Sequence, residues 1–474
     1  MITRNIPIFA VIVLLANISQ ANDARLSGMG NLSFVFQDDF NRLNLYDFAK
    51  MPAGFFTDDS FSVVSFTAAG LKERWQTDSL IYLTYWALGQ AFPENLQNYA
   101  PFEALGSVGY FDIPQFDLPP CQLRYESRRL HTEYGGFGEE LSPEALGVYA
   151  SYSQLSREYT VFETNDIMRT PELFVVYSRP VVSNLFFGAE ADGFYSMYRA
   201  AGNGEEANLK PFGGGLGISY TSGMFTLGLN SEYHYSMFDY KAISWNSEEY
   251  IEEFKGHAVS PSIAGIMSTK KFTWINLFGY KWLSLSGTQD GETDLGDLGI
   301  NDYLAKSQIM LQQKFFRFTA FGSFDTKTPE FIDNSGNPEF RTTYNNYTGV
   351  FGCGVDLPIV RAGIEGQYIA NSANDKIQET TVKGNDLTLK IGGEFSLTKD
   401  FLLRCGYNYN RADPNLNASD DHITSDLLTC GLGFDFARQM RLDFAYNCKW
   451  FSFENNVEQK VTDQILLLYI KYFM

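Results

Sequence analysis

The last third of the chain alternates apolar and polar residues with a period of two. Between positions 441 and 450, Leu442, Phe444, Tyr446, Cys448 and Trp450 fall on one side, and Arg441, Asp443, Ala445, Asn447 and Lys449 fall on the other. Segments 360–368, 387–395 and 401–410 repeat this pattern. A period of two predicts β-strands with one apolar face.

From about residue 172 the chain repeats a strand-like segment, a short connection, a second strand-like segment and a long polar connection. We predict short connections at 179–184, 221–223, 268–270, 314–316, 356–359, 397–399 and 436–439, and long loops at 239–255, 285–302, 326–344 and 411–424. This asymmetry is typical of outer-membrane barrels, which have tight periplasmic turns and long external loops.

A soluble β-sandwich also alternates apolar and polar positions. The strand-like segments here reach about 10 residues or more, the length needed to cross a bilayer at a tilt, whereas soluble strands average about 5 or 6. The apolar faces end in tyrosine or tryptophan, at Trp274, Tyr280, Trp282, Tyr407, Tyr409 and Trp450. We therefore predict an all-β fold, a transmembrane antiparallel up-and-down β-barrel.

The strand number is expected to lie between 14 and 18. Counting back from the C-terminus gives 15 strands, and single-chain bacterial barrels usually have an even number. Residues 147–153 and 157–163 are candidates for further strands, so 16 or 18 fits, with 14 if one hairpin belongs to a plug. Pieces at 62–66 and 80–86 also look strand-like, without an assigned place.

The two ends of the chain carry export and assembly signals. Arg4, the apolar run 6–15 and the small-x-small site 19–21 predict a signal peptide over residues 1–21. The final residues 463–474 place Leu466, Leu468, Ile470, Tyr472 and Met474 on one face, similar to the signal read by the outer-membrane barrel assembly machinery, with Met474 in place of the usual aromatic. We expect an N-terminal hatch and first strands over 22–146 and the barrel over 147–474.

Composition agrees with a barrel in contact with outer-membrane lipid. Aromatic residues make up 16% of the chain, with 28 Tyr, 41 Phe and 41 Gly, as expected for aromatic girdles and lumen-facing glycines. The net charge of −20 excludes a nucleic-acid partner, which would require clustered Lys and Arg. Five widely spaced cysteines form no metal pattern and are interpreted mainly as small apolar strand residues, while one disulfide remains an open alternative.

A glycine-rich motif lies just past the signal peptide. Residues 24–30 read Ala-Arg-Leu-Ser-Gly-Met-Gly, followed by the pair Asp38 and Asp39 and by Met-Pro-Ala-Gly-Phe at 51–55. This stretch resembles the mature N-terminus of the fatty-acid-transporter-like (FadL-type) superfamily, in which the N-terminal segment folds into the barrel as a hatch. The resemblance implies hatch roles for Gly28, Met29, Gly30, Pro52 and Gly54; it covers about the first 35 mature residues, and Met51 and Phe55 depart from the usual Asn and Leu.

Residues on the polar faces are expected to line the lumen. They are Arg317, Arg361, Glu365, Lys390, Glu394, Arg404, Arg441, Asp443 and Lys449. The second face of the last segment carries Leu467, Tyr469 and Phe473, which we expect to contact an apolar ligand or the hatch.

We expect no catalytic residues, no metal and no cofactor. The chain has four histidines, His131, His234, His257 and His422, none of them at metal-ligand spacing. His234, close to Glu232, is interpreted as a polar lumen residue. The acidic runs 290–294 and 413–421 lack the full spacing of a calcium loop.

Three functions remain open. The resemblance implies passive transport of hydrophobic small molecules past a movable hatch. The mixed lumen charges favour a general aqueous porin. Some FadL-type relatives act as surface shuttles in secretion, which implies a non-transporting binding barrel as the third hypothesis.

Overall fold

The computed structural model describes residues 29, 32, 61–76, 110–111, 118–135, 138–159, 164–182, 184–200, 206–243, 249–377, 379–415, 422–436, 440–454 and 459–473. Side chains are described at 29 and 32, at most positions from 173 to 450, and at 468. The predicted signal peptide, most of the predicted hatch and the piece at 80–86 lie outside these residues.

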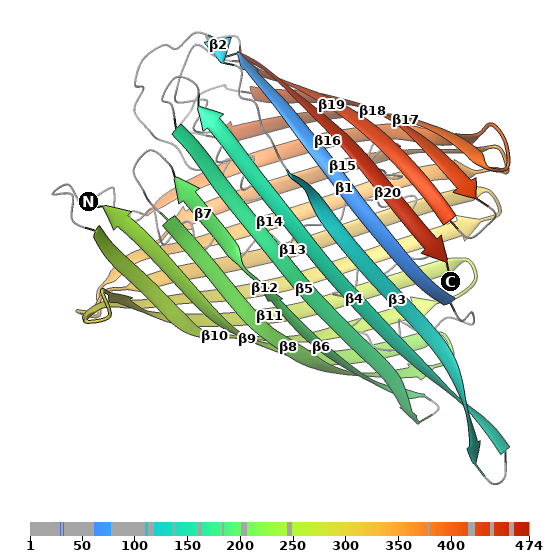
Figure 1. Cartoon of the computed structure of the whole chain (residues 1–474), viewed down its shortest axis with the longest axis horizontal. Coiled ribbons are helices and arrows are strands. Elements are labelled where there is room, and N and C mark those ends of the chain that lie inside the picture. Colours follow the sequence, from blue (N-terminus) through green and yellow to red (C-terminus); the bar gives the residue numbers. More distant parts are fainter. Residues whose placement is uncertain are drawn as a thin grey trace.

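The described chain is built from β-strands that slant across a single curved sheet (Figure 1). The first ten are β1 (Phe61–Gln76), β2 (Tyr110–Phe111), β3 (Leu118–Gly135), β4 (Gly138–Tyr159), β5 (Thr164–Val182), β6 (Leu185–Phe194), β7 (Ser196–Ala200), β8 (Glu206–Ser222), β9 (Phe225–Ile243) and β10 (Glu249–Ser268). The others are β11 (Phe272–Gln289), β12 (Thr293–Gln313), β13 (Phe316–Ile332), β14 (Pro338–Asp356), β15 (Val360–Asp375), β16 (Thr380–Ser396), β17 (Phe401–Asn415), β18 (His422–Phe436), β19 (Met440–Glu454) and β20 (Gln459–Phe473).

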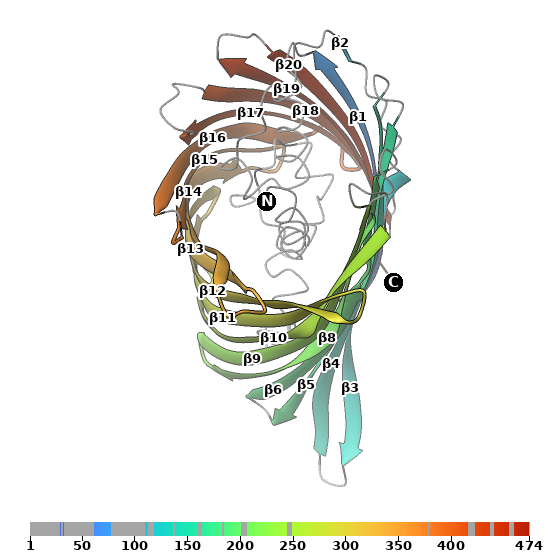
Figure 2. The same ribbon diagram turned by 90° about the vertical axis from the view of Figure 1, so that its left-hand side faces the viewer.

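Every pairing in the described sheet is antiparallel, and from β8 to β20 each strand pairs with the next in the chain. At the other end of the order, β1 pairs with both β3 and β20. The wall therefore curves around an interior (Figure 2). The up-and-down barrel predicted from the alternation is confirmed.

The strand number agrees with the upper end of the expected range. Of the twenty described segments, β2 has two residues, and β6 and β7 share one place because both pair with β5 and with β8. Eighteen strand positions remain among the described residues. The piece at 62–66 belongs to β1, which pairs with the last strand of the chain.

At all seven predicted short connections one strand ends and the next begins within a few residues, which confirms them; we call this edge of the barrel the turn end. Residues 183 and 437–439, in two of these connections, lie outside the described residues. The predicted long loops are wrong. Strands continue through most of those segments, so that β11 and β12 are separated only by residues 290–292 and β13 and β14 by 333–337. Likewise, 147–153 and the start of 157–163 lie in one strand, β4, rather than in two.

The outer face is apolar for about half of each strand, measured from the turn end. Phe351, Leu216 and Phe278 are 65%, 61% and 56% exposed, and similar side chains occupy neighbouring positions on β8 to β19. Exposed apolar area of this extent is unstable in water and is expected where lipid covers the wall. The opposite face holds buried polar groups, including Asn230, Thr319, Asn408 and Asn447.

Tyrosines mark the edge of this apolar band away from the turn end. The Tyr280 hydroxyl donates to Asn301 Oδ1 at 2.7 Å, and the Tyr368 hydroxyl donates to Asn385 Oδ1 at 2.9 Å. Tyr407 donates to Asp426 in the same way, and Tyr233 shares a 2.5 Å hydrogen bond with His257 Nδ1. An apolar ring with a hydrogen-bonded polar tip fits the boundary between lipid and water. Beyond this tyrosine belt the strands continue toward the edge that we call the far end.

Candidate functional site

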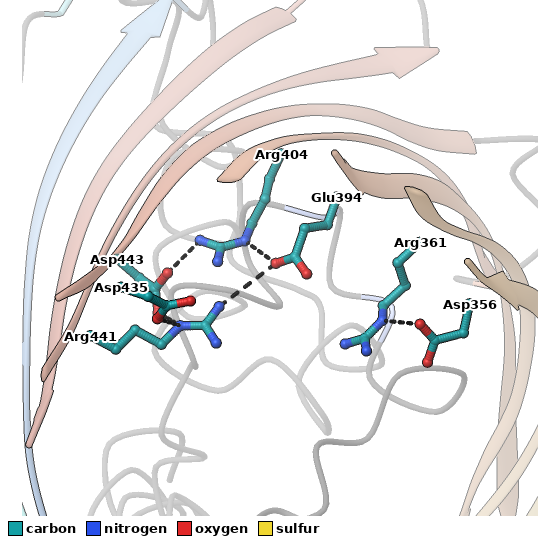
Figure 3. A network of polar contacts seen from close by, with 7 residues as sticks. All are labelled: Asp356, Arg361, Glu394, Arg404, Asp435, Arg441 and Asp443. Carbon is teal, nitrogen blue, oxygen red and sulfur yellow. Dashed lines mark hydrogen bonds and ion pairs between the residues drawn. The ribbon is translucent and has the colours of Figure 1, made fainter. Parts of the chain in front are cut away.

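A network of buried charges lies on the inner face of β16 to β19 near the turn end (Figure 3). Arg404 has no exposed side-chain surface; its Nε donates to Glu394 Oε2 at 2.7 Å and its Nη1 lies 2.6 Å from Asp443 Oδ1. Arg441 Nε donates to Asp443 Oδ2 at 2.9 Å and lies 3.8 Å from Asp435 Oδ1. Two arginines thus hold three carboxylates from neighbouring strands.

Gly433 makes this arrangement possible. Arg404 on β17 reaches across β18 to Asp443 on β19. A Cβ at position 433 would lie 2.5 Å from Arg404 Nη2 and 2.7 Å from Asp443 Oδ1. Any side chain at position 433 would therefore displace the ion pair.

The network continues along the turn end to β13. Asp356 accepts hydrogen bonds from Arg317 Nη2 at 2.7 Å and from Arg361 Nε at 3.1 Å. Farther along the wall, Lys390 Nζ lies 3.8 Å from Glu365 Oε2, and Glu365 is fully buried. Five positive groups (Arg317, Arg361, Lys390, Arg404, Arg441) and five negative groups (Asp356, Glu365, Glu394, Asp435, Asp443) balance one another, which limits the cost of burying them.

The N-terminal segment contacts the inner wall beside this network. Met29 and Leu32 are fully buried. The Met29 carbonyl oxygen lies 2.1 Å from the place that a Cβ at Gly392 would occupy, and Gly392 lies on β16 between Lys390 and Glu394. Of the other residues given a hatch role by the resemblance, Gly28, Gly30, Pro52 and Gly54 lie outside the described residues.

The far end of the interior carries an apolar cluster on β8 to β13. Its buried members are Ala207, Leu209, Phe238, Tyr240, Phe254, Ala258, Leu283, Leu285, Leu298, Ile300 and Phe331. The Phe254 ring lies 6.3 Å from the ring centres of both Phe238 and Phe331. The described interior is therefore apolar on one side of the far end and charged near the turn end.

A second pair of polar side chains meets across β8, where a glycine leaves room for the contact. His234 Nε2 on β9 lies 2.8 Å from Asp192 Oδ1 on β6, across Gly213, where a Cβ would lie 2.7 Å from His234 Cδ2. The nearby Glu232 accepts a hydrogen bond from Asn230 at 3.1 Å. The sequence predicted a polar lumen role for His234 without a partner, and its hydrogen-bond partner is Asp192.

The remaining predicted site residues are placed only in part. Lys449 is half-buried and its position pairs with Leu427. The backbone of β20 pairs Leu467 with Ala445 and Tyr469 with Asp443, and that of β1 pairs Val63 with Phe473. The side chains of Leu467, Tyr469 and Phe473 lie outside the described residues.

Sequence reasoning did not find the apolar cluster or the pair of Asp192 and His234. The run Gly213-Gly214-Gly215 inside a strand was an available signal, because glycine in a strand marks close approach of other groups. The apolar cluster gave no such signal, since six of its eleven members lie in segments predicted as loops: Tyr240, Phe254, Leu285, Leu298, Ile300 and Phe331.

The sheet of a soluble protein buries its apolar face and exposes its polar face. Here the apolar band and the tyrosine belt are exposed on the outside, and the charges are buried on the inside. These features define the protein as a transmembrane β-barrel of the bacterial outer-membrane class. In the described ranges there is no helix long and apolar enough to cross a membrane. Within those same ranges, no group of three or more His, Cys, Asp or Glu residues is placed to hold a metal ion.

No protein-family model and no curated protein matches the chain. Among solved structures it is similar to the copper transporter OprC, at 8% identity and TM-score 0.47 over 88% of this chain and 81% of that one. It is also similar to a FadL homologue from Pseudomonas aeruginosa (12% identity, TM-score 0.39) and to the toluene transporter TodX from Pseudomonas putida (12%, 0.36), each over 96% of this chain and 98% of the other.

Proposed function

We propose that this barrel passively transports hydrophobic small molecules across the outer membrane. The observation that carries the proposal is the apolar cluster, in which the side chains of Phe238, Phe254 and Phe331 lie on the inside of the wall and not against lipid. Phe238 and Phe254 are each 1% exposed, so a lipophile reaches this cluster only by displacing the groups packed on it. It then gains about 25 cal/mol for each Å² of its own apolar surface removed from water, whereas a water-filled pore gains nothing from apolar side chains on its inner face.

The contact of Met29 with Gly392 supports a hatch in this route. Met29 contacts the wall near the turn end, beside the charged network. A lipophile entering at the far end meets apolar side chains first and leaves past the hatch. Leu467, Tyr469 and Phe473 are proposed as further contacts of the ligand or of the hatch.

The general aqueous porin remains the second candidate, because the charged network lies on the inner face near the turn end. Single-channel conductance separates the two functions. A hatch-filled barrel conducts ions poorly, and an open porin conducts them well in the intact protein.

Native mass spectrometry of gently extracted protein tests the proposal directly. A bound lipophile is expected in the wild type and in Phe278→Ala, whose side chain faces outward, and reduced occupancy is expected in Phe254→Ala. Equal occupancy in both variants would remove the apolar cluster from the route. Absence of any lipophile in a folded wild type would count against hydrophobic transport.

A further inference from the structure

Three of the four cysteines whose side chains are described gather on neighbouring strands of the outer face. Cys405 lies on β17, Cys430 on β18 and Cys448 on β19, and none of the three is drawn in a disulfide. Cys405 and Cys430 are exposed and directly opposite each other in the register. On the other side Cys430 faces Tyr446, which places Cys448 two residues farther along β19.

The hydrogen-bond pattern of β17 and β18 fixes what kind of pair Cys405 and Cys430 form. At the turn end, the Asp435 N–H donates to the Asp400 carbonyl oxygen at 3.0 Å, so Asp400 and Asp435 are a hydrogen-bonded pair. The register then runs without a shift from Phe401 opposite Phe434 to Ala412 opposite Ile423. Because hydrogen-bonded and non-hydrogen-bonded pairs alternate along an antiparallel ladder, Cys405 and Cys430 form a non-hydrogen-bonded pair.

This pair type has the geometry for a cross-strand disulfide. Non-hydrogen-bonded partners have their Cα atoms about 4.5 Å apart and their side chains close together. Disulfides join Cα atoms about 4.4 to 6.8 Å apart. Diagonal neighbours such as Cys430 and Cys448 lie about 7 to 8 Å apart, outside that range. The register therefore selects one partner for Cys430.

We propose that Cys405 and Cys430 form a disulfide that joins β17 to β18 in the exported protein. The two thiols lose two protons and two electrons as their S–S bond forms. These protons and electrons pass to the disulfide of a periplasmic dithiol oxidase, whose own S–S bond breaks to give two thiols. The exchange takes place in the oxidising periplasm as β17 and β18 pair and before they insert, and lipid then shields the bond from reductants dissolved in water.

Thiol mapping of the full-length protein, extracted without reductant, tests this assignment. Free thiols are blocked with N-ethylmaleimide in denaturant, and the digest is read by mass spectrometry. The expected result is one linked peptide pair through Cys405 and Cys430, with Cys448 and Cys353 labelled. Maleimide on both Cys405 and Cys430, or a link from Cys430 to Cys448, would overturn the proposal.

Two matched variants make the result specific. Cys405→Ser is expected to expose Cys430 to maleimide without creating a new link, whereas Cys448→Ser is expected to leave the linked pair intact. Heat-modifiable gel mobility of each variant verifies that the barrel has folded before its thiols are counted. A linked pair that involves Cys430 in folded Cys405→Ser would contradict the selection of its partner by the register.

Discussion

The carbonyl oxygen of Met29 lies 2.1 Å from the position that a Cβ would take at Gly392, so these two residues pack backbone against backbone. Only glycine leaves room for such a contact, because real Cβ atoms do not approach an oxygen this closely. The contact joins the N-terminal motif to β16 between Lys390 and Glu394. Met29 thus lies beside the charged network of the wall.

Replacing Gly392 by leucine is expected to displace the N-terminal segment and to raise single-channel conductance of the reconstituted protein. Gly322→Leu is the matched control, because a Cβ at Gly322 meets nothing within 4 Å. The control is expected to conduct like the wild type. Unchanged conductance in folded Gly392→Leu would show that this contact does not close the lumen.

Arg404→Met is expected to destabilise the barrel by about 3–5 kcal/mol, because Glu394 and Asp443 would remain buried without their common partner. Denaturant unfolding in detergent, followed by circular dichroism, measures the change. Arg411→Met on the same strand removes an exposed arginine and is expected to cost no more than about 1 kcal/mol. Equal losses in the two variants would mean that the network contributes little beyond a surface ion pair.

Gly433→Ala is expected to lower the same unfolding free energy, because its Cβ would meet the Arg404 guanidinium and the Asp443 carboxylate. Combined with Arg404→Met, the glycine substitution should cost less, since the clash with the guanidinium is removed and only that with Asp443 remains. Additive losses in this double-mutant cycle would disprove the proposed role of Gly433 as the passage for Arg404.

Topology follows from the apolar band, which begins at the turn end. The turn end is expected to face the periplasm and the far end the cell exterior. A tag inserted at Asp294 or Ser419 should be labelled on intact cells, and one at Ser222 or Lys399 should not. The opposite labelling would invert the orientation of the barrel.

The proposed contacts on the last strand have a separate test. Leu467→Asn and Phe473→Ser are expected to weaken uptake of a long-chain lipophile and to leave heat-modifiable mobility unchanged. Lost assembly would assign these residues to plug packing or to the C-terminal assembly signal. Normal uptake in an assembled barrel would remove them from the ligand route.

The sequence predicted the part of each strand that crosses the membrane, because lipid imposes a period-two pattern there. On β16, for example, Leu389 and Ile391 are exposed on the outer face and Lys390 lies between them in contact with Glu365. The same rule failed past the tyrosine belt. Strands in contact with water need no apolar outer face, so segments such as 285–302 resembled loops although β11 and β12 continue through most of them.

The interior contacts could not be predicted from the sequence, and the reason is different. Alternation gives the face of Arg404 but not its reach across β18, which depends on Gly433 and on the register of three strands. The Asp192 and His234 pair and the contact of Met29 with Gly392 likewise join residues far apart in the chain. Such contacts depend on strand register and on the glycines that leave room for them, and not on a local pattern.

Uptake and conductance measured on the same reconstituted vesicles test the central claim most directly. Intact protein is expected to speed the entry of a fluorescent long-chain lipophile while ion conductance stays low, and deletion of residues 25–54 is expected to raise ion conductance. Large ion conductance in the intact protein, without faster entry of the lipophile, would contradict hydrophobic transport and would identify the barrel as a general porin.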